Sequence, residues 1–212
     1  GSGGDAIAAE VAAHLGLRLV DRETVHAAAL AAGVPDDLLA RLMYEGQRSL
    51  AAEILDSLAS PMSPAAARSA QASPLLGAFA PVLPASAVSI EDAARAVGRV
   101  IQDLARQDNV LILGQGGQMW LAGWPGACHV QIVAPMTERV RRLVQRDRGS
   151  PSAARRRLRA SDQARADYLA RYHNVNWLDP LLYHLIINTG QMPLESAATL
   201  VEQAARELAA AQ

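Results

Sequence analysis

The sequence predicts an α/β protein in which helices cover both faces of a parallel β-sheet. The first observation is a set of four short apolar runs with the length and content of buried strands, at residues 17–20, 110–113, 129–133 and 183–187. The second is that helical segments stand between these runs, and strands that alternate with helices pair in parallel. The 212 residues are 50% hydrophobic, which is enough for a single domain with a sizeable core.

The chain begins with a predicted helix followed by a predicted strand. Ile7, Val11 and Leu15 recur at helical spacing directly after a glycine-rich start, and Gly16 ends the pattern. The apolar run at residues 17–20 then predicts a short buried strand.

Two further helices and a proline-rich stretch follow the first strand. The helices are predicted at residues 24–32 and 35–58, and the second begins favourably at a proline. Residues 59–89 contain five prolines among alanines and serines, a composition that breaks regular structure. We expect this segment to be a flexible loop or lid with no core and with low protection from hydrogen exchange.

The second half of the chain alternates in the same way. Ser89 caps a predicted helix that runs to residue 107. After the next two strands, a basic helical stretch spans residues 136–172 with a break near residues 149–151, and a last helix spans residues 194–211.

Positive charge gathers in one segment, although the whole chain has a net charge of -1. Residues 139–171 hold 11 of the 20 basic residues against three acids, a net charge of +8, and the remainder has a net charge of -9. Every basic residue is an arginine, because the sequence contains no lysine. This asymmetry indicates an anionic ligand, with phosphate the obvious candidate.

The composition disfavours several other classes of protein. No apolar run reaches the ~18 residues that a membrane span needs, and the first residues lack the layout of a secretory signal. The single cysteine, Cys128, has no partner for an internal disulfide, and the five histidines show no paired metal-ligand spacing. We therefore expect a cytoplasmic protein without a structural metal.

A glycine-rich turn precedes the first helix. Such a turn directs backbone amides at a phosphate, and the helix dipole adds partial positive charge there. The predicted phosphate-binding residues are Gly1, Ser2, Gly3, Gly4, Asp5 and Ala6. The Gly-Ser-Gly-Gly stretch by itself is equally typical of a linker or a plain turn, so the prediction depends on the rest of the chain.

Several separated stretches together resemble the cytidylate kinase-like family. The Gly-Ser-Gly-Gly loop leads into a helix, and the next strand ends in Asp21-Arg22, as at the start of that family. The strand at residues 110–113 ends in Gly-Gln-Gly where the family has Gly-Arg-Gly, and a helix rich in arginine follows the strand at residues 129–133. The run Tyr-His-Leu-Ile-Ile-Asn-Thr at residues 183–189 resembles a closing motif. The resemblance extends from residue 1 to about residue 205.

The resemblance implies a P-loop kinase-like parallel sheet and a helical arginine-rich lid at residues 139–175. ATP phosphates would lie on the glycine loop with Mg²⁺, and the acceptor would be a pyrimidine nucleoside monophosphate. The implied partners are nucleotides, with no nucleic acid and no membrane, and the oligomeric state is left open. The residues assigned to the acceptor are Asp21, Arg22, Gln115 and Asp162. For Asp21 and Arg22, a helix-capping or salt-bridge role is an equal alternative.

Phosphoryl transfer depends on positioning and on neutralising charge, and arginines supply both. The arginines that we assign to catalysis are Arg139, Arg142, Arg159 and Arg165. The alternative is a solvated basic face in which Arg142 pairs with Glu138 and Arg171 pairs with Asp167. We expect most arginines of this segment to have that structural role.

Four residues depart from the expected pattern. Gly4 stands where a Walker A loop has its lysine, and Asp5 stands where the Mg²⁺-binding hydroxyl would be. Asp5 is therefore the candidate Mg²⁺ ligand. Gln115 stands where the resembled family has an arginine, and His184 where it has an aspartate. These changes predict weakened catalysis.

The resembled fold also has a central strand that leads into the phosphate loop, whereas this sequence starts at the loop itself. We therefore expect a sheet whose first central strand is missing from these residues. Without it, the two neighbouring strands would each expose unpaired backbone groups.

Three functions remain open at this point. The first is a nucleoside monophosphate kinase, and the second is a nucleotide-binding module that has lost catalysis and acts through a partner. The third is a helical interaction protein without a nucleotide site. The first two share a fold and differ in what Asp5 and Gln115 do.

Overall fold

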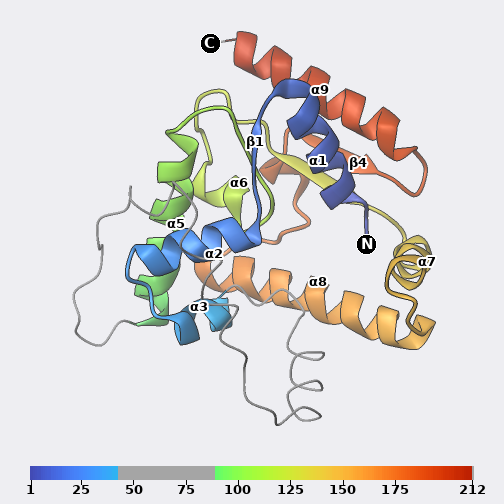
Figure 1. Ribbon diagram of the computed structural model, residues 1–212, viewed down its shortest axis with the longest axis horizontal. Coiled ribbons are helices and arrows are strands. Elements are labelled where there is room, and N and C mark those ends of the chain that lie inside the picture. The colour runs from blue at the N-terminus through green and yellow to red at the C-terminus, as the bar shows by residue number, and fades with distance from the viewer. Residues whose placement is uncertain (43–88, 212) are drawn as a thin grey trace, which may run out of the picture.

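Figure 1 shows the computed structural model of the protein, which describes residues 1–42 and 89–211. Short strands stand among longer helices. The strands are β1 (Arg18–Val20), β2 (Val110–Ile112), β3 (Val130–Val133) and β4 (Leu185–Asn188). The helices are α1 (Gly4–Leu15), α2 (Arg22–Ala31), α3 (Asp36–Leu42), α5 (Ile90–Ala105), α6 (Gly117–Trp120), α7 (Met136–Asp147), α8 (Pro151–His173) and α9 (Leu194–Ala210), with a 3₁₀ turn at Pro180–Leu182.

All four predicted strands form, each within two residues of its predicted ends, and they pair in parallel. β1 pairs with β2, so that Arg18 lies opposite Val110, and β3 pairs with β4, so that Val130 lies opposite Leu185. The described residues form two separate two-stranded sheets instead of the single sheet that we expected. The combination of helices and short parallel strands is consistent with an α/β kinase-like fold. It does not fit an all-helical interaction protein.

A cavity of about 1420 Å³ is lined by strands of both sheets. All three residues of β2 and the first three residues of β3 border it, together with apolar side chains of α1 and α9. Within the described part of the chain, β2 bonds only to β1 and β3 bonds only to β4. One edge of each strand is therefore left with unpaired backbone donors and acceptors.

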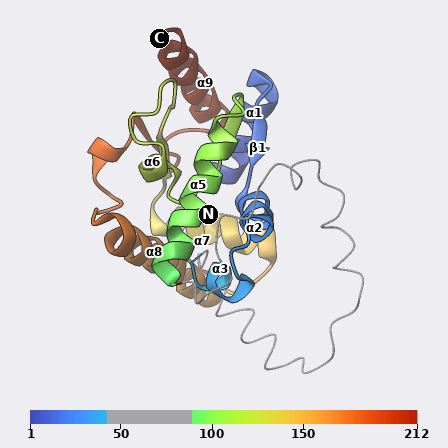
Figure 2. The same ribbon diagram turned by 90° about the vertical axis from the view of Figure 1, so that its left-hand side faces the viewer.

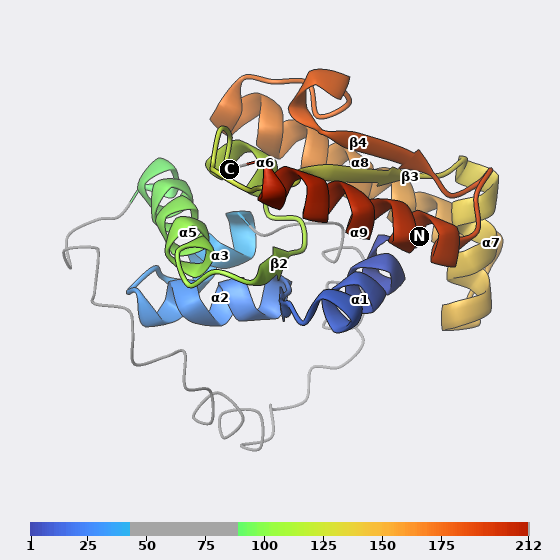
Figure 3. The ribbon, with the colours of Figure 1, turned by 90° about the horizontal axis from the view of Figure 1, so that it is seen from above.

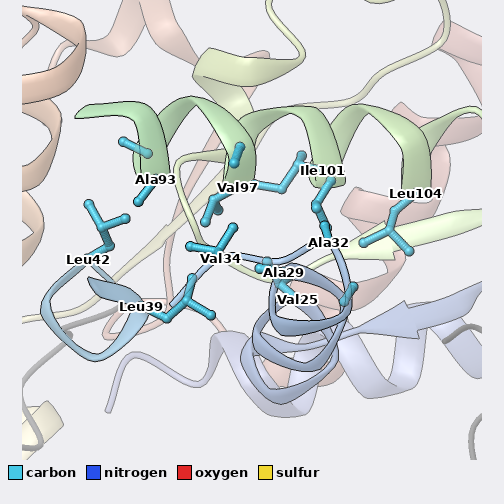
Figure 4. Packing of buried hydrophobic residues seen from close by; sticks show 14 of the residues in the cluster. Val25, Ala29, Ala32, Val34, Leu39, Leu42, Ala93, Val97, Ile101 and Leu104 are labelled. Atoms are coloured by element: carbon cyan, nitrogen blue, oxygen red, sulfur yellow. The ribbon is translucent and has the colours of Figure 1, made fainter. Parts of the chain in front are cut away.

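Two groups of helices provide the core. In the larger group, α2, α3 and α5 pack around side chains that include Val25, Leu39 and Ile101, each fully buried (Figure 4). Figure 2 looks onto this side of the molecule, with α5 toward the viewer. In the second group, α1 and α9 lie side by side and pack on Ile187 of β4 (Figure 3).

Local sequence signals explain where the helices begin. Ser89 caps α5, as predicted, because its hydroxyl accepts a hydrogen bond from the Asp92 amide at 3.1 Å. The predicted break in the basic segment is also found. Arg148 ends α7 in a left-handed conformation, and Ser150 caps α8 with Pro151 at its first position.

Two predictions fall outside the described residues. The helix predicted at residues 35–58 is observed as α3 up to Leu42, and its remainder lies beyond the described range. The flexible segment predicted at residues 59–89 lies, except for Ser89, in the same undescribed part of the chain. None of the described helices is long and apolar enough to cross a membrane.

Candidate phosphate site

The glycine loop leads directly into α1. Gly3 has a left-handed backbone (φ 90°) and caps the helix without any side-chain hydrogen bond. A Cβ at Gly3 would meet the Leu194 side chain at 2.6 Å, so this position requires glycine for both space and conformation. In the described structure, the amides of Gly4, Asp5 and Ala6 have no hydrogen-bond acceptor. Free amides at a helix N-terminus form a favourable environment for an anion.

Three arginines lie near enough to the start of the loop for their charges to act on it. Arg139 lies against Gly1, since a Cβ on Gly1 would be 3.2 Å from the Cβ of Arg139. The charges of Arg139, Arg146 and Arg165 all act on Gly1, and the charge of Asp5 opposes them. These arginines contribute positive potential at the start of the loop, which favours an anionic ligand.

Arg139 is held by a carboxylate of the next helix. Its two terminal nitrogens each donate to an oxygen of Asp162 at 2.7 Å, and the two side chains are only 16% and 25% exposed. Arg165 lies 3.9 Å from the same carboxylate and stacks over the ring of Trp177 at 5.1 Å. Asp162 thus neutralises part of the positive charge of these two arginines, which a phosphate would otherwise neutralise.

The other predicted catalytic arginines have different positions. Arg142 binds protein atoms, namely the Ser2 carbonyl at 3.0 Å and the Thr189 carbonyl at 2.7 Å. Arg159 is exposed on α8 and does not line the cavity, whereas Arg139 and Arg165 do. The structure therefore brings two of the four predicted arginines to the cavity beside the loop.

Of the two ion pairs that we considered as the structural alternative, one forms and the other does not. Arg142 does approach Glu138, with 3.1 Å between Nε and the carboxylate. The predicted pair of Arg171 with Asp167 is wrong. Arg171 instead lies 3.3 Å from Glu91 of α5, and Asp167 accepts from Gln163 at 2.7 Å, because helix packing places α8 beside α5.

Asp21 and Arg22 lie at the carboxyl end of β1 and line the cavity. Asp21 caps α2, since its carboxylate accepts from the Thr24 amide at 2.8 Å and from the Thr24 hydroxyl at 2.7 Å. The hydrogen bond from the Thr24 backbone amide lowers the pKa of Asp21, and the hydrogen bond from the Thr24 hydroxyl lowers it further by a smaller amount. Asp21 thus caps α2, which is one of the two roles that we considered for it, and its role in binding the acceptor stays a prediction.

Gln115 lies in an unusual turn after β2. Gly114, Gln115 and Gly116 all have positive φ, of 76°, 58° and 68°. Gln115 is only 9% exposed, lines the cavity and has no side-chain hydrogen bond within the described structure. A buried polar residue held in a left-handed conformation is typical of a functional site.

Sequence reasoning missed Thr189. This residue follows β4, is 3% exposed, and donates from its hydroxyl to the Ser2 carbonyl at 2.6 Å. Two signals were available: its place just beyond a predicted strand, where ligands of α/β proteins bind, and its position at the end of the 183–189 run that resembles a family motif.

The fold is that of an α/β protein in which a glycine-rich loop leads into a helix N-terminus. A profile of the cytidylate kinase-like family matches residues 1–191, and the chain belongs to that family. A solved structure of a protein from Eubacterium ventriosum has the same fold, with a TM-score of 0.65 and 17% sequence identity. That similarity covers 98% of this chain and 93% of the other.

Curated relatives align over part of their length. A cytidylate kinase of Halobacterium salinarum is 26% identical over 103 residues, 49% of this chain and 54% of that protein. A cytidylate kinase of Haloquadratum walsbyi is 26% identical over 110 residues, 52% of this chain and 57% of that protein. The chain thus spans about half the length of these relatives. A uronate isomerase of Corynebacterium glutamicum is 32% identical over 108 residues, 51% of this chain but 21% of that protein.

The capping role of Asp21 predicts a pH-dependent loss of stability. Asp21→Ala should lower the free energy of unfolding by about 1 kcal/mol at pH 7, because the Thr24 amide loses its acceptor. The pKa of Asp21 is below its ordinary value of 3.8, so its ionised form stabilises the fold above that pH, and this contribution is lost as the pH falls through the folded pKa. Urea unfolding at pH 7 and at pH 3 measures both effects.

Asp21→Asn is the matched control, because asparagine caps a helix about as well as aspartate and does not titrate. It should stay close to the wild type at pH 7 and show less loss in acid. Equal stability of Asp21→Ala and the wild type at pH 7 would contradict the capping role.

Proposed function

We propose that this protein transfers a phosphoryl group from ATP to a cytidylate-like nucleoside monophosphate, with weakened catalysis. Membership of the cytidylate kinase-like family supports a nucleoside monophosphate kinase-like function. The observation on which the proposal chiefly rests is the positive environment around a loop whose helix amides lack acceptors.

Each group would have a defined part in the transfer. An oxygen of the acceptor phosphate attacks the γ-phosphorus of ATP, and ADP leaves with the bridging oxygen. The amides of Gly4, Asp5 and Ala6 would bind the ATP phosphates. Arg139 and Arg165 would neutralise charge on the transferred group, and helices α7 and α8 would form the arginine lid. Asp21, Arg22 and Gln115 border the same cavity and are proposed to bind the acceptor.

Magnesium would arrive with ATP, and the donor set is compatible with it. Mg²⁺ usually takes one or two carboxylates together with phosphate oxygens and waters, and Asp5 offers one exposed carboxylate in the first turn of α1. No cluster of three metal-ligating side chains exists among residues 1–42 and 89–211, so phosphates would have to provide most of the ligands. The ion would neutralise phosphate charge when bound.

Weak catalysis follows from the same residues. A lysine at position 4 and an arginine at position 115 are both absent, and Asp5 adds a negative charge beside the phosphates when no metal is bound. One preorganised charge contact contributes a few kcal/mol to a transition state, about 100-fold in rate or more. The alternative function, a nucleotide-binding module that acts through a partner, is favoured by Asp5 and Gln115.

We also propose that a further parallel strand, joined ahead of Gly1, occupies the cavity between the two sheets. The backbone donors and acceptors along its two edges would hydrogen-bond to the unpaired groups on the open edges of β2 and β3. The apolar side chains of Ile7, Val11 and Val201 line the cavity, and a strand buried on both faces is rich in such residues itself. Gly1 borders the same cavity, so this strand would pass directly into the phosphate loop.

Turnover measurements test the proposed function. With Mg·ATP, the protein should bind nucleotide and phosphorylate CMP, dCMP or UMP slowly, and Asp5→Arg with Gln115→Arg should strengthen nucleotide binding. Coupled ADP release measures the rate, and calorimetry measures the affinity. An ordinary kinase rate in the unmodified chain contradicts the weakened catalysis, and absence of any nucleotide or phosphate binding contradicts the site itself.

Hydrogen exchange tests the proposed strand. An apolar β-branched segment added ahead of Gly1 should slow exchange of the β2 and β3 amides and raise the free energy of unfolding by about 2 kcal/mol or more. The matched control has proline at the centre of the added segment, since proline cannot donate to a strand ladder. Equal protection in the two extended chains would contradict the proposal.

A further inference from the structure

Two side chains that are distant in sequence from Ser2 both donate hydrogen bonds to its carbonyl oxygen. The Thr189 hydroxyl donates to it at 2.6 Å, and Nη1 of Arg142 donates to it at 3.0 Å. The two side chains also bind one another, because Nη1 of Arg142 lies 2.9 Å from the Thr189 hydroxyl oxygen. We call Arg142 and Thr189 the loop clamp.

The hydrogen bonds of Arg142 leave it little capacity to bind a phosphate. Nη1 donates to Ser2 and Thr189, Nη2 donates to the Thr189 carbonyl at 2.7 Å, and Nε faces the Glu138 carboxylate at 3.1 Å. All three nitrogens therefore have protein partners, and Glu138 balances the charge. Arg139 differs, because its charge-assisted bonds all go to the carboxylate of Asp162.

The clamp has a consequence for the amide that follows Ser2. In a trans peptide the carbonyl oxygen and the next N–H lie on opposite sides of one planar unit, and all peptide bonds among the described residues are trans. Because the Ser2 oxygen points to Arg142 and Thr189, the Gly3 N–H points away from them. The left-handed Gly3, followed by helical Gly4, then places successive amides in a concave arrangement that binds anions.

A loop without the clamp would lose this orientation. The Gly3 backbone has no side chain to restrict it, so the peptide unit between Ser2 and Gly3 would be free to rotate. Rotation would turn the Ser2 oxygen toward the ligand and the Gly3 N–H away from it. A carbonyl oxygen in that place repels a phosphate oxygen.

We infer that Arg142 and Thr189 are positioning residues, which fix the Ser2–Gly3 peptide so that its N–H faces a bound phosphate. The inference rests on the proposed function for the identity of the ligand. It replaces the direct phosphate contact that the sequence predicted for Arg142. The chemical class of the ligand is a phosphate or polyphosphate anion, bound mainly by backbone amides.

The experiment measures pyrophosphate affinity by NMR titration and the order parameter of the Gly3 amide without ligand. Thr189→Val removes the hydroxyl and keeps the shape, and Arg142→Gln removes the guanidinium. Each should weaken pyrophosphate binding by about 10-fold or more and increase ps–ns motion at Gly3. The double variant should be little worse than either single one, because both act on one carbonyl. Thr189→Ser should restore affinity to within about threefold, since it keeps the hydroxyl.

Arg156→Gln is the matched control, because it removes the same charge from an exposed arginine of α8 for which the described structure shows no contact with the loop, the clamp or Glu138. It should leave both measurements unchanged. If Arg142→Gln weakens binding while Thr189→Val does not, Arg142 contacts the phosphate directly and the clamp is overturned. Unchanged Gly3 order in both variants also overturns it. If the wild type binds no pyrophosphate, the proposed function fails, and the Gly3 order alone then decides the clamp.

Discussion

The structure depends most on the electrostatic relation between the loop at the start of α1 and the arginines of α7 and α8. Helix amides without acceptors on one side and Arg139, Arg146 and Arg165 on the other gather positive potential in one place. Like charges repel, so an anion among them stabilises this arrangement. Within the protein, Asp162 has that role toward Arg139. A phosphate ligand would compete for the same guanidinium, which couples ligand binding to the contact between the two helices.

The divided sheet sets the second constraint. Four short parallel strands form two pairs, and a cavity lined by apolar side chains and by open strand edges lies where the pairs face one another. Unpaired backbone groups are costly when water is excluded, so an occupant with a strand's hydrogen-bonding pattern would stabilise both edges together. Because Gly1 borders this cavity, the proposed strand would be linked to the glycine loop through a single backbone segment.

Local sequence patterns predicted much of the fold. The strands and most helices were found from apolar periodicity, and the Ser89 cap and the break before Pro151 from residue chemistry at helix ends. The site was predictable only in part, because its contacts join distant residues. Thr189 meets Ser2 across 187 positions, and no local pattern indicates that pairing. The partner of Arg171 was also missed, since Glu91 lies on a helix 80 positions earlier.

The most direct test of the central claim is an experimental structure of the protein with a non-hydrolysable ATP analogue. The account predicts phosphate oxygens at about 2.7–3.1 Å from the amide nitrogens at the start of α1, with Arg139 turned from Asp162 toward the phosphates. A nucleotide bound elsewhere, or phosphates bound only by exposed arginines with the Arg139–Asp162 pair intact, would contradict it.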